Sequence, residues 1–188
     1  MILDILKYGH PVLRSKGKKI EKITEEIQHL AAGMLETMRE NAGVGLAAQQ
    51  VGKSLQMTVI DVTGVERPST LEIDGKQIAP ESLMPLVLIN PTVTLPEGEQ
   101  VGVEGCLSFP EISAEIKRAH RVFVQGTNLK GERFHFHCTG LLSRAAQHEV
   151  DHLNGILFID RMDSATKASL SGRLKRLQKE TKDQLPKR

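Results

Sequence analysis

The sequence contains no tryptophan, and aromatic residues make up only 3% of its 188 residues. Leucine, isoleucine and valine must therefore build most of the core, and the length suits one ordinary globular domain. Any run of about 18 apolar residues, the length that would span a membrane, is also missing. The sequence thus excludes a transmembrane helix, while 39% hydrophobic and 26% charged residues are typical of a globular chain.

The N-terminus lacks the features of an export signal. Met1–Leu6 has no basic segment, and Asp4 interrupts its short apolar stretch, unlike a secretory signal peptide. The Arg- and Ser-rich character of an organelle transit peptide is missing too. We therefore expect a cytoplasmic location and no association with a membrane. In a reducing compartment, the two cysteines, Cys106 and Cys138, are expected to be thiols or metal ligands and not a disulfide.

Positive charge is concentrated at the C-terminus. The net charge is +2, but the residues from Ser164 onward include eight Lys/Arg and two Asp/Glu, which gives +6 and leaves 2 − 6 = −4 for residues 1–163. Leu170, Leu174 and Leu177 lie at helical spacing in this basic segment, and Pro186 ends the pattern. We expect a main domain at 1–163 and a basic C-terminal helix within 164–188.

The order of the remaining predicted elements favours an α+β fold. Residues 24–41 show helical spacing of apolar residues, with a capping threonine and acidic residues in the first turn. Residues 63–84 predict a long loop or a hairpin, and residues 141–153 predict a second helix. Strands are expected at 56–62, 86–90, 101–108, 113–118, 121–125 and 132–137. Strands in the middle and helices at the ends predict short, mainly antiparallel sheets around a central metal-binding helix, with an N-terminal and a C-terminal helix.

The strongest chemical signal lies in the helix predicted at 141–153. His148-Glu149-Val150-Asp151-His152 has the HExxH pattern, which places both histidines on one face of a helix, where they can bind one metal ion. Glu149 lies beside that face and can take a proton from water. The alternative is an ordinary charged helix surface, but apolar residues flank the motif and unpaired buried histidines would be costly.

A catalytic metal site needs a third protein ligand. Cys106, preceded by a glycine, is one candidate, although a lone cysteine is more often a small buried core residue. Cys138 is the rival candidate, next to His135 and His137. Alternation along a strand would turn Cys138 into the core and the two histidines toward solvent. From the residues alone, the third ligand stays open.

Three segments together resemble the three motifs of the peptide deformylase family, and they occur in the same order. The segments are Gly43-Val44-Gly45-Leu46-Ala47-Ala48-Gln49-Gln50, Glu104-Gly105-Cys106-Leu107-Ser108 and Gln147-His148-Glu149-Val150-Asp151-His152-Leu153-Asn154-Gly155. The similarity extends from Ile5 to about Met162. One departure is Gln49, at a position where the family usually has proline, and its loss is expected to loosen this loop.

The resemblance implies a metal-dependent hydrolysis of the formyl group from the N-terminus of newly made proteins, with release of formate. It implies Cys106, His148 and His152 as ligands of one divalent metal, Fe²⁺ in cells, with Zn²⁺, Ni²⁺ or Co²⁺ possible in preparations. It also implies Glu149 as the general acid and base. The side-chain amide of Gln50 and the backbone N–H of Leu107 are expected to bind the developing oxyanion. Substrate-binding residues are expected to be Val44, Gly45, Leu46 and Ala145.

The sequence leaves more than one role open for Arg144, for Glu104 and for the basic C-terminal helix. Arg144 precedes His148 by one helical turn, and we expect its charge to reach the rim of the cleft or the surface. Glu104 can accept a hydrogen bond from a ligand histidine or pair with an arginine such as Arg118. The basic C-terminal helix is either a solvated helix or a docking surface for the ribosome, the expected partner besides the formylated nascent peptide. We expect a monomer.

Two other functions are compatible with an HExxH helix. A metallopeptidase that cuts internal peptide bonds predicts a third ligand downstream of His152, and none follows at the required spacing. A ribosome-associated module with a structural metal predicts a fourth protein ligand and no role for Glu149.

Overall fold

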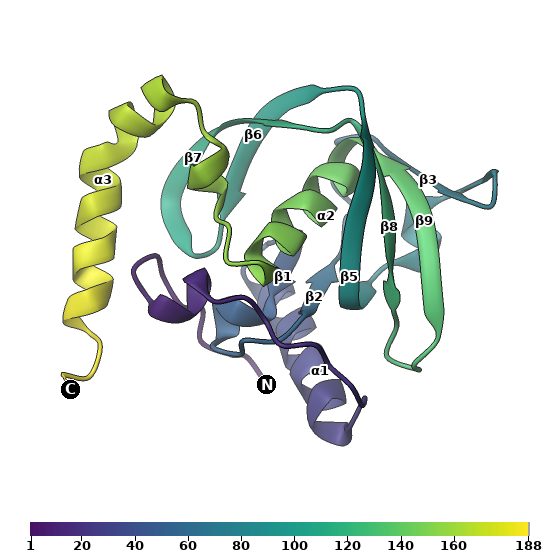
Figure 1. Ribbon diagram of the computed structural model, residues 1–188, viewed down its shortest axis with the longest axis horizontal. Coiled ribbons are helices and arrows are strands. Elements are labelled where there is room, and N and C mark those ends of the chain that lie inside the picture. The colour runs from purple at the N-terminus through teal and green to yellow at the C-terminus, as the bar shows by residue number, and fades with distance from the viewer. Residues whose placement is uncertain (188) are drawn as a thin grey trace.

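The computed structural model describes residues 1–187 and confirms the predicted α+β class (Figure 1). The α-helices are α1 (Glu25–Glu40), α2 (Gly140–Leu153) and α3 (Ser164–Asp183), and the 3₁₀ helices are η1 (Pro11–Arg14), η2 (Ala48–Val51), η3 (Pro80–Leu83) and η4 (Phe158–Arg161). The strands are β1 (Gly45–Ala47), β2 (Met57–Ile60), β3 (Ser69–Ile73), β4 (Lys76–Ile78), β5 (Leu86–Glu97), β6 (Gln100–Cys106), β7 (Phe109–Arg118), β8 (Arg121–Thr127) and β9 (Arg133–Thr139).

Two antiparallel sheets surround α2. One has seven strands in the order β1-β2-β5-β8-β9-β3-β4, and the other is the hairpin of β6 and β7. In Figure 1, α2 lies in the middle of the molecule, with β6 and β7 on one side and β5, β8 and β9 on the other. A helix enclosed in this way needs apolar residues on most of its surface, and Leu142, Ala146 and Leu153 are indeed fully buried.

Helix α1 begins where the sequence predicted. The side chain of Thr24 accepts a hydrogen bond from the backbone N–H of Ile27, and acidic residues occupy the first turn. Met34 and Met38 are fully buried against β1 and β2. The chain then turns directly into β1, so α1 sets the position of the segment from Gly45 onward.

Strand β5 is longer than the sequence predicted. It was expected at 86–90 but continues to Glu97, across Pro91 and Pro96. Both prolines fall at shifts in the pairing of β5 with β8, between Ile89 and Thr92 and between Thr94 and Glu97. Proline cannot donate a ladder hydrogen bond, and β-bulges are among the places in a sheet that tolerate it.

Residues 63–84 form the hairpin that was one of the two sequence-based expectations. Strands β3 and β4 meet at a turn in which Asp74 and Gly75 both have positive φ, of 50° and 79°. Strand β3 also pairs with β9, so the hairpin extends the main sheet. The segment before β3 lies against the start of α2, since Leu141 N donates to Pro68 O at 3.0 Å.

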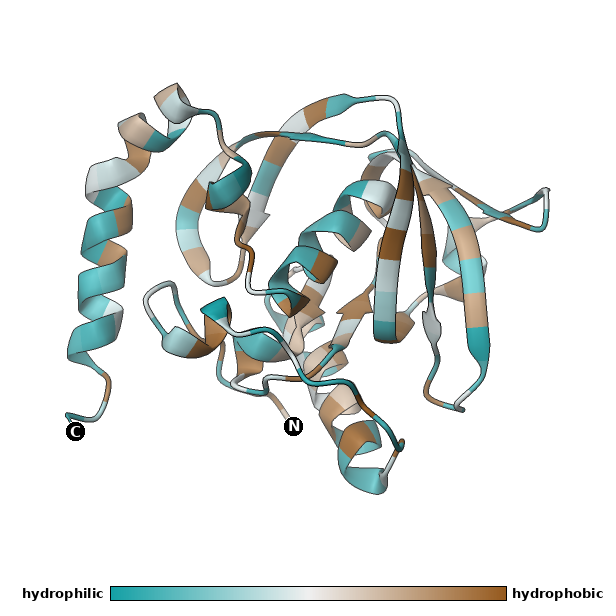
Figure 2. Cartoon of the chain, viewed as in Figure 1, coloured by the Kyte–Doolittle hydropathy of each residue, from teal (hydrophilic) through white to brown (hydrophobic). Residues whose placement is uncertain are grey.

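Helix α3 packs through one narrow stripe. Asp163 caps it by accepting from Thr166 N at 2.7 Å, and Leu174 is buried, with Leu170 and Leu177 partly buried beside it in the same apolar cluster. Figure 2 shows that most of α3 is hydrophilic. The division into units 1–163 and 164–188 stays a prediction. Within residues 1–187, no helix combines the length and apolar character needed to cross a membrane.

Candidate active site

Helix α2 brings the two motif histidines together. The Nε2 atoms of His148 and His152 lie 3.2 Å apart, as expected for two side chains separated by four residues on one helix face. Both rings are buried, with 8% and 1% of their surfaces exposed. Two adjacent imidazoles with nitrogens aimed at one point are the arrangement that binds a metal ion.

Cys106 completes this cluster from the end of β6. Its Sγ lies 3.4 Å from Nε2 of His152, and the ligand atoms of Cys106, His148 and His152 all fall within 4.8 Å of one another. Metal–nitrogen and metal–sulfur bonds of about 2.0 and 2.3 Å in a tetrahedral site would separate the ligand atoms by about 3.3–3.5 Å. The three residues therefore fit one metal ion and leave a fourth position for solvent or substrate.

Cys138 does not belong to this cluster. Its side chain is only 1% exposed and packs in the apolar core among residues of β3 and β8, as strand alternation predicted. Burial raises the pKa of its thiol to about 12, which keeps it neutral. Of its neighbours on β9, His135 is exposed and contacts Asp74, whereas His137 is only half-exposed.

The carboxylate of Glu104 accepts hydrogen bonds from His148 and from two arginines. Its Oε1 lies 2.7 Å from Nδ1 of His148, and Arg118 donates to both of its carboxylate oxygens, at 2.8 and 2.9 Å. Arg144 adds a third charged donor at 2.6 Å. The sequence had left a choice between orienting a histidine and pairing with Arg118, and Glu104 does both.

The expectation that Arg144 reaches the rim or the surface was wrong. Its side chain is only 2% exposed, and Nη1 donates both to Glu104 and to the carbonyl of Ile116, the latter at 2.9 Å. The physical reason is the two-stranded sheet, which covers this face of α2 and supplies a buried carboxylate there. A buried arginine needs such a partner, and the sequence of α2 alone does not show it.

The charges around the cluster favour a cation. Burial alone would raise the pKa of Glu104, but hydrogen bonds from Arg118 and His148 outweigh it and hold this pKa well below its usual range. Burial also disfavours the protonated ring of His148, yet its hydrogen bonds to Cys106 and Glu104 raise its pKa to about 10. The side of the cluster at His148 therefore stabilises positive charge, whereas burial and the neighbouring His148 lower the pKa of His152, so this ring stays neutral and can act as a metal ligand.

Glu149 lies on the same helix and faces β1 and β2. Burial raises its pKa to about 7, against the opposing effect of His148. Its Oε2 lies 3.3 Å from Oγ1 of Thr58, a neighbour that the sequence motifs did not indicate. Gly45 is the other neighbour, and it lies so close that a Cβ atom there would collide with Oε1 of Glu149. A carboxylate with a pKa near neutrality is suited to accept and return a proton.

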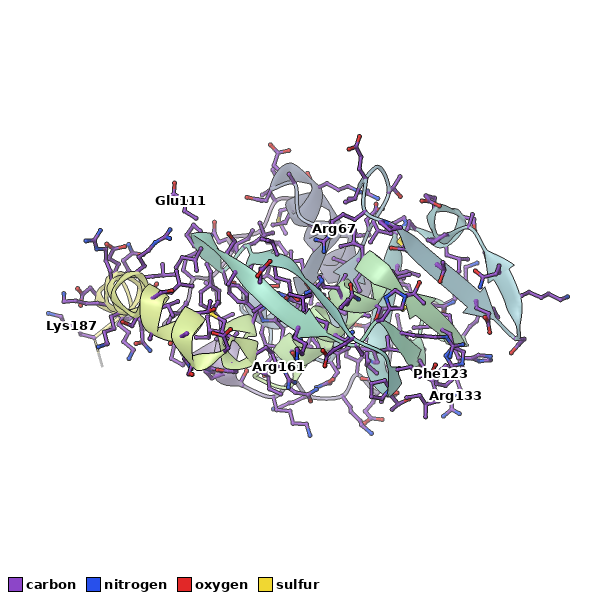
Figure 3. All side chains as sticks on the ribbon, turned by 90° about the horizontal axis from the view of Figure 1, so that it is seen from above. Arg67, Glu111, Phe123, Arg133, Arg161 and Lys187 are labelled. Atoms are coloured by element: carbon purple, nitrogen blue, oxygen red, sulfur yellow. The ribbon has the colours of Figure 1, made fainter. Side chains whose placement is uncertain are left out.

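Cys106, His148 and Glu149 line a cleft of about 640 Å³. Of the residues expected to bind substrate, Val44, Gly45 and Ala145 line it, together with Gln50, Leu107 and Glu149. Leu46 does not line the cleft, because its side chain is fully buried in the core cluster beneath α1. Figure 3 shows Glu111, which also lines the cleft, on the opposite side of the molecule from Arg133 and Arg161.

Comparisons with known proteins decide the family. The model of the polypeptide deformylase family matches residues 2–168. The chain belongs to this family. A peptide deformylase of Opitutus terrae is 44% identical over 184 residues, which cover 97% of this chain and 96% of that protein.

Solved structures of family members share the fold. The crystal structure of the peptide deformylase from Thermus thermophilus has a TM-score of 0.80 and 36% identity, and covers 96% of this chain and 99% of that one. An inhibitor complex of Arabidopsis thaliana peptide deformylase 1B has a TM-score of 0.83 and 34% identity, with 98% and 96% covered.

Membership of the deformylase family establishes the activity. The chain is a metal-dependent hydrolase that removes the formyl group from the N-terminus of nascent polypeptides. A peptidase of internal bonds and a non-enzymatic module are thereby set aside. The described residues also offer only three metal ligands at this point, one fewer than a closed structural site needs.

The deformylase motif that ends at Gln50 is held in place by hydrogen bonds. Gln50 is 2% exposed; its Nε2 donates to Oγ of Ser108 at 3.1 Å, and its Oε1 accepts from Ala47 N at 2.9 Å. Gln49, where the family usually has proline, is fully buried, and its Nε2 lies 3.4 Å from Leu153 O. These contacts tie the loop to the end of α2. Thr58 lies outside the three motifs, and Ser108 is the last residue of the second motif, to which the sequence had assigned no role.

Proposed function

We propose that Cys106, His148 and His152 hold one divalent metal ion and that Glu149 is the general acid and base of deformylation. The observation that carries the proposal is the convergence of the three ligand atoms within 4.8 Å, beside Glu149 and at one cleft. When bound, a divalent ion would supply Lewis acidity, which lowers the pKa of water toward neutrality and polarises the formyl oxygen.

Glu149 then moves one proton in two steps. Its carboxylate accepts a proton from the water that attacks the formyl carbon, and it later gives this proton to the nitrogen of the leaving amine. Formate and a free N-terminus result. The buried setting that brings its pKa to about 7 makes both transfers feasible near neutral pH.

Gln50 and Leu107 are positioned to stabilise the developing oxyanion. Nε2 of Gln50 lies 3.5 Å from Sγ of Cys106, so an oxygen that forms beside the thiolate lies within reach of the amide. Leu107 follows Cys106 directly and lines the same cleft, and we assign its backbone N–H as the second donor. Donors fixed before reaction need no reorganisation when charge develops.

The substrate peptide occupies the cleft between β1 and the β6–β7 sheet. Gly45 presents backbone next to Glu149, and Val44 lies beside it. The small side chain of Ala145 leaves room for the methionine side chain. We assign Leu46 a role only through its backbone, since its side chain is buried in the core.

We propose Fe²⁺ as the ion used in cells. One thiolate and two imidazoles form a donor set that suits Fe²⁺, and also Zn²⁺, Ni²⁺ and Co²⁺. The test is formate release from formyl-Met-Ala-Ser by protein prepared without oxygen, with the metal content measured in parallel. Activity that follows iron content supports the assignment, and equal activity of metal-stripped protein contradicts the metal site.

We propose that α3 docks on the ribosome. We also propose that the protein is located in the cytoplasm and is a monomer. Lys175, Arg176 and Lys182 are exposed on this helix, while its leucines face the core. Changing all three to glutamine should weaken binding to ribosomes, since each lost phosphate contact reduces both affinity and its salt dependence. Hydrolysis of a short formyl peptide should not change.

The matched control replaces Lys22, Lys76 and Lys130, which are exposed on other surfaces, by glutamine. Equal ribosome binding by the two triple variants would contradict docking through α3. Sedimentation of the free protein tests the monomer.

A further inference from the structure

Arg67 places an unneutralised charge at the entrance of the cleft. It belongs to the segment that precedes the β3–β4 hairpin, is exposed and lines the cleft. Among residues 1–187, its guanidinium makes one hydrogen bond, from Nη1 to the carbonyl of Val103 at 3.3 Å, and no carboxylate lies within ion-pair distance. An arginine has five N–H donors, so most of them remain available to a ligand.

Gly102 on β6 makes room for this guanidinium. A Cβ atom at Gly102 would lie 2.8 Å from Nη2 of Arg67 and 3.2 Å from Nη2 of Arg144. Two positive groups thus lie close to one point on the cleft wall. Arg144 is bound by Glu104, but that carboxylate is already shared with Arg118 and cannot serve Arg67 as well.

The other charged groups at the cleft do not neutralise Arg67. Lys7 adds a further cation and donates to Leu107 O at 2.8 Å. Glu149 is buried at the reaction centre, and Glu111 is exposed at the same cleft as Arg67. Figure 3 places Arg67 and Glu111 on the same side of the molecule, apart from each other. The wall at Arg67 is therefore a positive site that faces solvent and incoming peptide.

We propose that Arg67 is a specificity-determining residue that binds a carboxylate side chain at the second or third residue of the formylated peptide. The inference rests on the proposed function, because it needs the peptide to lie in this cleft. Ala145 is buried and flanks the expected methionine pocket, whereas Arg67 is exposed. The guanidinium of Arg67 therefore faces the peptide residues that follow methionine. An aspartate or glutamate at one of these positions gives faster deformylation than a lysine at the same position.

The test compares kcat/KM for four peptides: formyl-Met-Asp-Ser, formyl-Met-Lys-Ser, formyl-Met-Ala-Asp and formyl-Met-Ala-Lys. All are amidated at the C-terminus, so that a terminal carboxylate does not bind in place of the side chain. The variants are Arg67→Gln, the charge reversal Arg67→Glu, and the control Lys76→Gln. Lys76 lies on the β3–β4 hairpin that follows Arg67, is exposed and does not line the cleft.

The measured quantity is the preference for aspartate over lysine within each variant, so differences in metal content cancel. At one of the two positions the unaltered protein should prefer aspartate by about two- to fivefold at low salt, as for an exposed ion pair. Arg67→Gln should bring the ratio to about one, Arg67→Glu should invert it, and Lys76→Gln should keep it. The change should lie mainly in KM, since the contact is equal in ground and transition states.

Two results would overturn the inference. Formate release at equal efficiency from the aspartate and lysine peptides, or a preference that persists in Arg67→Gln, removes Arg67 as the determinant and leaves the deformylase activity intact. If metal-loaded protein releases formate from none of the four peptides, the proposed site and its reaction are contradicted, and this inference falls with them.

Discussion

Nδ1 of His148 lies 2.7 Å from Oε1 of Glu104, and both groups are buried. The carboxylate accepts the proton on Nδ1, so Nε2 is the ring nitrogen that faces the metal position, where a metal ion would take the place of the second ring proton. Arg118 continues the network, since its Nη1 donates to Asp151 at 2.7 Å, and Arg161 reaches the same carboxylate from the surface. The orientation of the His148 ring is thus fixed by a network of charged side chains from three elements, namely Glu104 on β6, Arg118 on β7 and Asp151 on α2.

Replacing Glu104 by alanine should weaken metal binding. The loss of the acceptor frees the ring of His148 and leaves Arg118 without its bidentate partner, and loss of such a contact reduces metal affinity by about 10- to 100-fold. Competition with a chelator, followed by metal analysis, measures this. The control is Glu115→Ala, an exposed acid on β7. Equal metal retention by both variants would show that Glu104 does not orient the ligand.

Replacing Glu149 by alanine should abolish turnover and keep the metal. The three ligands are untouched, whereas proton transfer, which contributes about 10²- to 10⁴-fold, is lost. Formate release and metal content are measured on the same sample. Unchanged deformylation by this variant would rule out Glu149 as the acid and base.

Gly45→Ala should reduce activity more than it reduces stability. The added methyl group would collide with Oε1 of Glu149, so the carboxylate must move away from its position. A displacement of about 1 Å can cost on the order of 100-fold in kcat. The matched control is Gly172→Ala on α3, where a Cβ meets nothing within 4 Å. This control should keep its activity and gain about 0.5–1 kcal/mol in free energy of unfolding. Full activity of Gly45→Ala would contradict the close packing.

The ion pair of Arg14 and Asp160 should give a stability difference that depends on pH. Burial acts to raise the pKa of Asp160, but hydrogen bonds from Arg14 and from Leu157 N outweigh it and lower this pKa. A lowered pKa in the folded state stabilises the fold above the unfolded pKa of about 3.9, and this contribution is lost as pH falls through the folded value.

Arg14→Gln should therefore unfold at lower urea concentration than the unaltered protein at pH 7. The gap should stay constant down to about pH 5 and shrink below about pH 4, since Asp160 then becomes protonated in both proteins. Lys19→Gln, which removes an exposed charge near the same segment, is the control. A gap that persists unchanged at pH 3 would show that the pair is not its cause.

The sequence by itself determined the elements with strong local signals. The spacing of His148 and His152 put both on one helix face, and Thr24 and Pro186 marked helix ends, because these effects act within one or two turns of chain. The alternation of Phe134, Phe136 and Cys138 placed Cys138 in the core for the same local reason. Three motifs in order were enough to indicate the family.

The tertiary structure alone decided which distant groups share the buried site. Arg144 is enclosed only because β6 and β7 cover that face of α2 and bring Glu104 to it. Thr58 and Arg67 reach the site from β2 and from the segment before β3, and nothing local in the sequence indicates such contacts. The continuation of β5 through Pro91 and Pro96 likewise depends on bulges opposite β8. Residues far apart in the sequence come into contact only through tertiary packing, so the spacing of residues within one segment does not predict these contacts.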